Sequence, residues 1–172
     1  MADEIVDVIN DNDEVIGKEG KNKCHKEGLW HRTVGIFIFN DNEDLLLQKR
    51  SMNMATSPGK YDCSASGHVG SGKTQEEDAI KELKEELGIE INLKLIFKNL
   101  TENFDEGKNK IRHLFSLFIG HHNGPFNIGK FEVDSVKFFS FDEMTKTIGK
   151  TPNDFTFALK MLFKKYKGEF KE

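Results

Sequence analysis

The chain has 172 residues, of which 37% are hydrophobic and 31% are charged, and its net charge at pH 7 is −4. These values are typical of a globular protein with a sizeable core, and they do not support nucleic-acid binding through a basic surface. No apolar run approaches the ~20 residues that a membrane helix needs, and the N-terminal residues lack the pattern of a signal peptide. We therefore expect a single cytoplasmic domain over residues 1–172, with no membrane partner and no nucleic-acid partner.

The two cysteines, Cys24 and Cys63, are too few for a disulfide framework. Together with His25 and His31 they do not show the spacing of a zinc site. From spacing along the chain we therefore expect no zinc site.

The first part of the chain is predicted to form β-strands. Residues 1–30 form an N-terminal extension that contains a hairpin over residues 4–19, with its turn at Asp11-Asn12-Asp13. Arg50 emerges at the end of a later strand, where ligand-binding groups often gather, and an ordinary surface cation is the alternative. Runs of apolar residues predict three further strands, at residues 33–40, 45–50 and 61–66.

A glycine-rich turn followed by a helix is predicted at residues 67–89. Thr74 and Glu77 have the spacing of a capping box, and Gly88 supplies a left-handed stop. At about 100° per residue, one face of the helix carries three carboxylates. These are Glu82, Glu85 and Glu86, and the adjacent arc, expected to pack on the core, carries Ala79, Ile80, Leu83 and Leu87.

The three carboxylates are three and four residues apart and repel one another. Each such pair destabilises a helix by a few tenths of a kcal/mol. A hard divalent cation, which takes oxygen ligands, would offset this repulsion. The alternative is a solvated acidic face with Lys81 and Lys84 as partners, and spacing alone leaves both interpretations open.

The rest of the chain is predicted to contain strands and two amphipathic helices. Ser140 and Glu143 have capping spacing at the start of a short helix, and a final helix begins near Pro152 and ends at Gly168. The expected strands cover residues 91–99, 114–119 and 133–140, and polar loops are expected at 101–110 and 121–130. The apolar stripe of the final helix is assigned to the core: Phe155, Leu159, Leu162, Phe163 and Tyr166.

Residues 67–89 resemble the Nudix box, G-x5-E-x7-R-E-U-x-E-E-x-G-U, in which U is a bulky aliphatic residue. The matching residues are Gly67, Glu82, Leu83, Glu85, Glu86, Gly88 and Ile89. The resemblance implies an α/β (α+β) Nudix fold, a mixed β-sheet sandwiched between helices, here with an N-terminal β-hairpin. Lys73 and Lys81 stand where the box has the Glu and Arg that generally support the loop and the helix. Support must then come from elsewhere, for example from a Glu77–Lys81 contact.

Most of the chain is similar to a Nudix branch often grouped with isopentenyl diphosphate isomerase, through segments such as residues 5–17 and 58–69. In those isomerases a cysteine precedes the Gly-His of the box loop, and an acidic residue lies in a later strand. Here Ser66 stands at the cysteine position, and Cys63 falls on the opposite face of an extended strand. Because Ile111 and His113 stand at the acidic positions, an isomerase is not the first choice.

Three histidines carry a further part of this resemblance. His31 and His68 match metal-binding histidines of the isomerases, and His25 is a candidate for a third. They are interpreted as residual similarity of the scaffold or as a second metal site. For a lone histidine near a strand end, a structural role is favoured.

The general chemistry of the family implies a divalent-metal-dependent hydrolase that cleaves the diphosphate linkage of a nucleoside diphosphate linked to another moiety. Mg²⁺ or Mn²⁺ would be held by Glu82, Glu85 and Glu86. The candidate general bases are Glu85, Glu86 and Glu132, whereas Glu102 is expected to be a solvated loop acid. The candidates for ligand binding are Gly67, Arg50 and His68.

Two alternative functions stay open at this point. One is an isomerase-like enzyme, and the other is a degenerate, non-catalytic nucleotide-binding Nudix domain, which Lys73 would mark. In each case the expected partner is a small-molecule diphosphate or nucleotide, and the oligomeric state is open, a homodimer included. Aromatic residues suited either to stacking a base or to packing are Trp30, Phe104 and Phe126.

Overall fold

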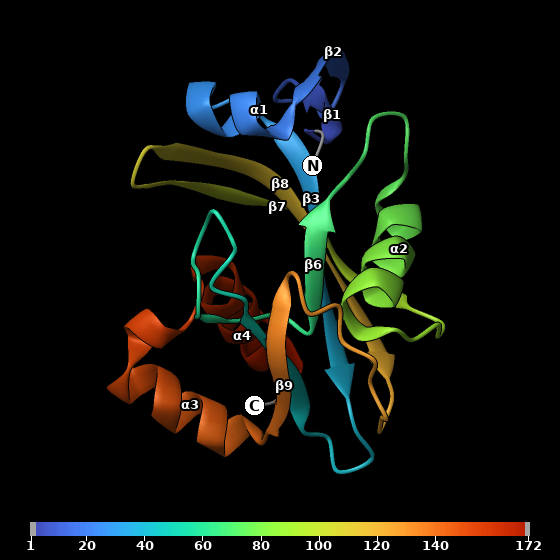
Figure 1. Ribbon diagram of the computed structural model, residues 1–172, viewed down its shortest axis with the longest axis vertical. Helices are drawn as coiled ribbons and strands as arrows, with labels where there is room; N and C mark the ends of the chain where they lie inside the picture. Colours follow the sequence, from blue (N-terminus) through green and yellow to red (C-terminus); the bar gives the residue numbers. More distant parts are fainter. Residues whose placement is uncertain (1–2, 171–172) are drawn as a thin grey trace.

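A computed structural model describes residues 3–170 as a nine-stranded mixed sheet with helices on both sides (Figure 1). The strands are β1 (Ile5–Ile9), β2 (Val15–Gly20), β3 (His31–Phe39), β4 (Leu45–Arg50), β5 (Tyr61–Asp62), β6 (Ala65–His68), β7 (Lys94–Glu106), β8 (Asn109–His121) and β9 (Val133–Phe139). The helices are α1 (Lys21–Glu27), α2 (Gln75–Leu87), α3 (Phe141–Lys150), the 3₁₀ helix η1 (Pro152–Asp154) and α4 (Phe157–Phe170).

The predicted fold class, a mixed sheet between helices with an N-terminal hairpin, is confirmed. Within residues 3–170, no helix has the length and apolar character needed to cross a membrane. The assignment of residues 1–172 to one domain stays a prediction.

Strand β3 is the centre of the sheet. It runs parallel to β8 from the pair His31–His113 to the pair Phe39–His121. It also pairs antiparallel with β6 and, at its end, with β4. All residues of β3 except Arg32 are buried, as expected for a strand that is covered on both faces.

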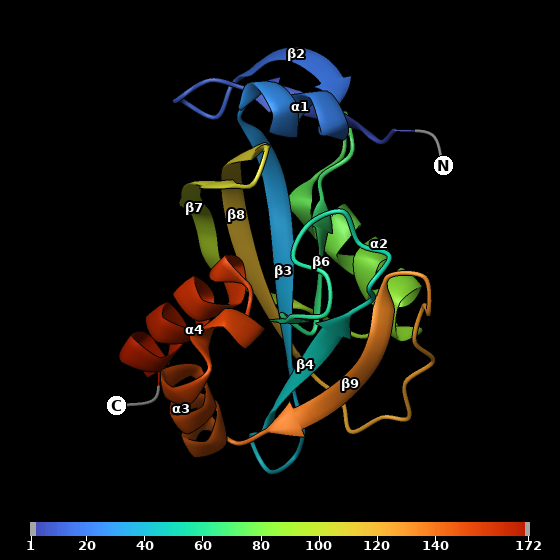
Figure 2. The same ribbon diagram turned by 60° about the vertical axis from the view of Figure 1, so that its left-hand side comes forward.

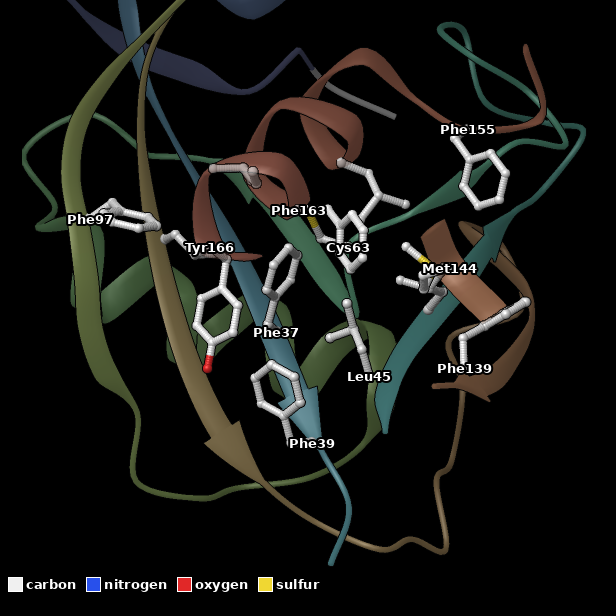
Figure 3. Packing of buried hydrophobic residues seen from close by; sticks show 14 of the residues in the cluster. Phe37, Phe39, Leu45, Cys63, Phe97, Phe139, Met144, Phe155, Phe163 and Tyr166 are labelled. Atoms are coloured by element: carbon white, nitrogen blue, oxygen red, sulfur yellow. The ribbon is translucent and has the colours of Figure 1, made fainter. Parts of the chain in front are cut away.

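The alternation of side chains along β3 divides the core into two hydrophobic clusters. Val34, Ile36 and Ile38 face α2, where Ala79, Leu83 and Leu87 complete one cluster. Phe37 and Phe39 face α3 and α4, where the aromatic ring of Tyr166 lies 6.0 Å and 5.5 Å from theirs (Figure 3). All five residues of the expected apolar stripe belong to this second cluster, which confirms their assignment to the core. The last helix begins at Phe157 instead of near Pro152, so Phe155 lies between η1 and α4.

The N-terminal hairpin is confirmed, but the helix that follows it, α1, was not predicted. Gly28 ends α1 with a φ of 76°, and Cys24 is its one fully buried residue within the described chain. With seven residues, α1 is too short for an amphipathic pattern to be recognised in the sequence. The hairpin and α1 lie together at one end of the sheet (Figure 2).

The predicted polar loop at residues 101–110 is wrong. Strands β7 and β8 continue through this segment as a long antiparallel hairpin that turns at Gly107, where φ is 61°. The segment is polar on both faces, so its period-2 pattern is weak, yet alternate side chains still point inward. Glu102 is one of them and is only 3% exposed, so the prediction of a solvated loop acid is also wrong.

Three smaller predictions differ from the structure. Ile80 is 44% exposed, because the buried side of α2 is shared between apolar residues and carboxylates. Gly168 lies inside α4 instead of ending it. The single strand expected at residues 61–66 is divided into β5 and β6 at Cys63 and Ser64.

The capping box of α2 is confirmed. The Thr74 side chain accepts a hydrogen bond from Glu77 N, and the Glu77 carboxylate accepts one from Thr74 N at 2.8 Å. Gly88 ends the helix in the left-handed conformation, with φ 67°. Because Glu77 is engaged in this cap, it does not form the suggested pair with Lys81, whose ammonium contacts other carboxylates.

The loop that precedes α2 is held by two aspartates. Asp7 of β1 accepts hydrogen bonds from Ser71 Oγ at 2.7 Å and from Gly72 N at 3.0 Å. Burial would raise the pKa of Asp7, but these hydrogen bonds outweigh it and lower the pKa. Asp78, in the first turn of α2, accepts a hydrogen bond from Gly70 N at 3.0 Å. The hairpin and α2 thus support the loop through Asp7 and Asp78, not through Lys73 and Lys81, the two positions that differ from the Nudix box.

Replacing Asp7 by alanine is expected to destabilise the protein by about 2 kcal/mol, because two donors lose a charged acceptor. The melting temperature should fall by about 4–8 °C. Thermal unfolding followed by circular dichroism measures this change.

The matched control is Asp11→Ala, at an exposed position in the turn of the same hairpin. This substitution should change stability by less than about 0.5 kcal/mol. Equal stability of Asp7→Ala and wild type would contradict the role given to Asp7 in holding the loop.

Candidate active site

The cavity beside α2 is lined by four carboxylates. Glu82, Glu85 and Glu86 come from α2, and Glu132 comes from the turn that precedes β9. The fold therefore brings Glu132, a candidate base, close to the three predicted metal ligands of α2, although about fifty residues separate them in the sequence.

The loop that carries Glu132 lies against the end of α2. Asn127 N donates to Leu87 O at 2.9 Å, and Gly129 N donates to Glu86 O at 3.0 Å. A Cβ at Gly129 would lie 2.4 Å from Glu85 O, so a larger residue would push the loop away from the helix. Glycine at this position lets the turn bring Glu132 to the cavity.

Glu86 is the most enclosed of these carboxylates and is 3% exposed. Its Oε2 accepts hydrogen bonds from Ser66 N at 2.8 Å and from Gln48 Nε2 at 2.9 Å. Burial raises the pKa of Glu86 well above its usual range, and the neighbouring carboxylates of Glu82 and Glu132 raise it further. Gln48, a partner that sequence reasoning missed, lies on β4, where its apolar neighbours made it look like an ordinary strand residue.

Glu82 lies against the backbone of β6. It is 6% exposed, and a Cβ at Gly67 would lie 2.6 Å from its Oε1. Glycine at position 67 therefore leaves the space that the Glu82 carboxylate occupies. Burial raises the pKa of Glu82 to about 7, against the opposing effect of the Lys81 ammonium.

Lys81 places a positive charge among the acidic groups. Its Nζ lies 3.0 Å from Glu82 Oε1, 3.4 Å from Glu85 Oε2 and 3.6 Å from Glu4 Oε1. Burial would lower the pKa of Lys81, but these carboxylates outweigh it and raise the pKa. Lys84, the other partner suggested from the sequence, pairs with Glu90 instead. The Lys81 ammonium thus lies beside the carboxylates of Glu82 and Glu85.

A second cavity shares these four carboxylates with the first and is also lined by Arg50. Its Nη1 lies 2.8 Å from Asp62 Oδ2, and its Nε donates to Thr56 O at 3.3 Å. Asp62 is fixed in turn, because its Oδ1 accepts a hydrogen bond from Thr156 Oγ1 at 2.8 Å. Arg50 is therefore a held, partly buried guanidinium that lines the cavity, and the alternative of an ordinary surface cation does not fit.

One end of the same cavity is apolar. The rings of Phe104 and Phe157 lie 4.3 Å apart between centroids, and both line the cavity together with Met54 and Ala55. Phe157 is 45% exposed. Of the other two aromatic candidates, Phe126 packs against the cluster under α2, and Trp30 does not line this cavity.

Four histidines lie together in the fold, and all of them except His31 also line this cavity. They are His25, His31, His68 and His113. The first three were singled out in the sequence, and the fold brings them together, so none of them is a lone histidine. His113 was noted only as a departure from an acidic position. Its place on the inward face of β8, in register with Ile111 and Phe115, is the signal that could have identified it.

Ser66 and Cys63 lie in different environments, as the odd spacing predicts. Ser66 lines the cavity, whereas Cys63 is fully buried in the hydrophobic cluster beneath α4. Burial raises the pKa of the Cys63 thiol well above its usual range. Among the described residues that line the cavity there is no cysteine.

Comparison with known proteins identifies the family. The family model of the NUDIX domain matches residues 29–159. An isopentenyl-diphosphate Delta-isomerase 2 of Aromatoleum aromaticum is 28% identical over 160 residues, which cover 92% of this chain and 84% of that protein. An uncharacterized Nudix hydrolase of Clostridium acetobutylicum is 33% identical over 128 residues, which cover 69% of this chain and 60% of that protein.

A solved structure from Deinococcus radiodurans has the same fold. It matches with a TM-score of 0.80 at 20% identity, over 94% of this chain and 98% of that one. At this identity the likeness concerns the fold alone. With the family match over most of the chain, the conclusion is that this protein belongs to the Nudix family, as an enzyme of its pyrophosphohydrolase class.

Proposed function

We propose that the protein is a divalent-metal-dependent hydrolase that cleaves the diphosphate linkage of a nucleoside diphosphate joined to another moiety. The observation that carries the proposal is the cluster of Glu82, Glu85, Glu86 and Glu132 on one cavity. Two of these carboxylates are almost fully buried, where ionisation is costly without a cation. Such an arrangement costs stability and is expected where function requires it.

The residues proposed to hold Mg²⁺ or Mn²⁺ are Glu82, Glu85 and Glu86. When bound, such an ion neutralises phosphate charge and acts as a Lewis acid. Support for this assignment comes from the donor set, which is all oxygen, and from the Lys81 ammonium, which lies where the carboxylates attract positive charge. Gly67 is proposed to act by leaving room for Glu82.

Glu132 is the residue we propose as the general base. It lines the cavity beside Glu86, and its backbone is held, since Ser51 N donates to Glu132 O at 2.8 Å. Glu86 is less suited, because its Oε2 already accepts two hydrogen bonds. Glu85 is less suited because its side chain is 59% exposed, whereas a base works best in a site that excludes bulk water. Glu132 would take the proton of the attacking water.

The other walls of the cavity suggest how the substrate is bound. Arg50, held by Asp62, is proposed to contact the diphosphate through its remaining N–H groups. The paired rings of Phe104 and Phe157 are proposed to stack against the base of the nucleoside.

An isomerase-like activity is the second candidate. It is favoured by the relative from Aromatoleum aromaticum that bears the isomerase name and by the gathering of His25, His31 and His68. Against it stands Ser66 at the position where a cysteine is expected, in a cavity whose described lining has no thiol. A non-catalytic binding domain is disfavoured, since such a domain has no need for a costly cluster of carboxylates.

Replacing Glu86 by glutamine should lower kcat by about 10²–10⁴-fold, because the variant loses a carboxylate that holds the ion. The same change should leave the metal-free fold intact or stabilise it, since glutamine carries no buried charge. Activity assays with Mg²⁺ and thermal unfolding in a chelator measure the two effects. The matched control is Glu76→Gln, at an exposed position in the first turn of α2.

The stability gain of Glu86→Gln should depend on pH. The folded pKa of Glu86 is raised, so its contribution to stability is greatest below the unfolded value of 4.5 and is lost as pH rises towards the folded pKa. The advantage of the variant should therefore be larger at pH 8 than at pH 5. An equal difference at the two values, together with wild-type kcat, would contradict the assignment.

Replacing Lys81 by methionine removes the positive charge between Glu82 and Glu85 while keeping an apolar stem. We expect the metal-free variant to be less stable by on the order of 0.5–1 kcal/mol, since Lys81 is partly exposed and screened. Saturating Mg²⁺ should restore this loss and should raise the melting temperature more in the variant than in wild type. If Mg²⁺ stabilises both proteins equally, the ammonium and the ion do not share these carboxylates.

A panel of substrates separates the three functions. We expect Mg²⁺-dependent release of two phosphorylated products from at least one nucleoside diphosphate derivative, dinucleoside polyphosphate or nucleotide sugar. Conversion of isopentenyl diphosphate without any hydrolysis would favour the isomerase. Binding of nucleotides without turnover would favour the non-catalytic domain.

A further inference from the structure

The four histidines come from four separate elements. His25 lies on α1, His31 begins β3, His68 ends β6 and His113 lies within β8. One nitrogen of each ring lies within 4.8 Å of the corresponding nitrogen of every other ring. The Nε2 atom of His25 is 3.2 Å from that of His113 and 3.2 Å from that of His68. The rings therefore point their nitrogens at one common space.

These separations match those required by a tetrahedral metal ion. Metal–nitrogen bonds of 2.0–2.1 Å at tetrahedral angles place neighbouring nitrogens about 3.3 Å apart. Two nitrogen pairs already have a separation close to this value, at 3.2 Å. None of the remaining pairs exceeds 4.8 Å, so binding an ion would require them to close by at most about 1.5 Å.

Two of the rings are oriented by partners behind them. His31 Nδ1 lies 2.8 Å from Leu29 O, and His113 Nδ1 lies 2.7 Å from Glu102 Oε2. Leu29 O can only accept, so His31 Nδ1 carries the proton and the lone pair on its Nε2 faces the common space. An ionised Glu102 carboxylate would hold His113 in the same tautomer. A carbonyl or carboxylate behind a histidine is the usual support of a metal ligand. This supplies a role for the buried carboxylate of Glu102, which the proposed hydrolysis does not use.

The centre of the cluster is only partly satisfied by hydrogen bonds. His25 Nε2 can donate a single hydrogen bond, to His113 Nε2 or to His68 Nε2, each of which lies 3.2 Å away. His31 is 0% exposed, and its Nε2 has no hydrogen-bond partner among the described residues. Because one N–H cannot satisfy all of these nitrogens, lone pairs stay directed at the common space, and loss of the shared proton on metal binding would let all four rings bind a cation.

We propose that His25, His31, His68 and His113 form a closed, four-nitrogen site for Zn²⁺ that joins α1 to the sheet. The donor set is entirely imidazole, which suits Zn²⁺ and other borderline transition ions and does not suit Mg²⁺. Four protein ligands fill a tetrahedron, so no coordination position stays open for a substrate, and the site is structural. It is distinct from the oxygen-donor cluster of α2. Spacing along the chain predicted no zinc site because the ligands come from four elements and include neither cysteine.

The proposed role follows from the position of α1. A seven-residue helix is marginal by itself, and within the described chain Cys24 is its one fully buried residue. His25, Lys21 and Asn22 of this helix line the cavity. An ion shared with β3, β6 and β8 would fix α1, and with it one wall of the cavity.

Zinc binding tests the proposal without reference to activity. The full chain, stripped with a chelator, is dialysed against Zn²⁺ in the presence of excess Mg²⁺, and bound metal is measured by elemental analysis. We expect one Zn²⁺ per chain and an increase in melting temperature. Replacement of Zn²⁺ by Co²⁺ should give visible absorption bands of the intensity typical of tetrahedral Co²⁺. Absence of stoichiometric binding, or a Co²⁺ spectrum typical of octahedral coordination, would overturn the proposal.

Variants locate the bound ion. His113→Asn and His31→Asn should each lower the affinity for Zn²⁺ by at least about 100-fold, whereas His121→Asn, at an exposed position, should not. Glu86→Gln should keep the Zn²⁺ stoichiometry and lose hydrolysis, so that failure of this site and failure of the proposed function are distinguishable. Zn²⁺ retained in the histidine variants but lost in Glu86→Gln would assign the ion to the glutamates instead.

Glu102 is tested as a positioning residue. Glu102→Gln should keep the tetrahedral Co²⁺ spectrum while weakening Zn²⁺ binding about 10–100-fold. Hydrogen exchange gives an independent measure that does not depend on a variant folding. In wild type, Zn²⁺ should slow amide exchange in α1 relative to the metal-free protein. Unchanged exchange in α1 would contradict the proposal that the ion joins α1 to the sheet.

Discussion

The structure depends on the burial of carboxylates where α2 crosses the sheet. Glu82 occupies the space left by Gly67, and Glu86 is held by Ser66 N and Gln48 behind it. Like charges in such a position oppose folding, so the surrounding chain must position and neutralise them. The tight turn at Gly129, the ammonium of Lys81 and the support of the loop before α2 are all consequences of this constraint.

The N-terminal extension takes part in the same arrangement. Asp7 of the hairpin holds the loop before α2, and Glu4 lies near the Lys81 ammonium. His25 of α1 belongs to the histidine cluster. The extension therefore contributes residues both near the carboxylates of α2 and to the histidine cluster. Under our proposals it would help to form an oxygen-donor metal site and a nitrogen-donor metal site. The two donor sets would separate Mg²⁺ from Zn²⁺ by ligand chemistry.

Much of the fold could be predicted because local signals agreed with the tertiary structure. The capping residues of α2, the buried run of β3 and the apolar stripe of α4 each specify one element with little help from distant residues. The polar hairpin at residues 101–110 could not be predicted, because its period-2 pattern is weak and it extends two strands beyond the part of β8, from His113 on, that pairs with β3. The grouping of His113 with three other histidines depends on strand register, which one sequence does not give.

The central claim, hydrolysis of a diphosphate at the α2 carboxylates, is tested most directly by following oxygen from water. The protein and a nucleoside diphosphate derivative are incubated with Mg²⁺ in ¹⁸O-labelled water, and the phosphorylated products are analysed by mass spectrometry. Our account predicts one ¹⁸O atom in one of the two products when the wild-type chain acts with Mg²⁺. It predicts no ¹⁸O above background over the same time when Mg²⁺ is left out or when Glu86 is replaced by glutamine. Turnover of isopentenyl diphosphate with no ¹⁸O gained in any phosphate would contradict it.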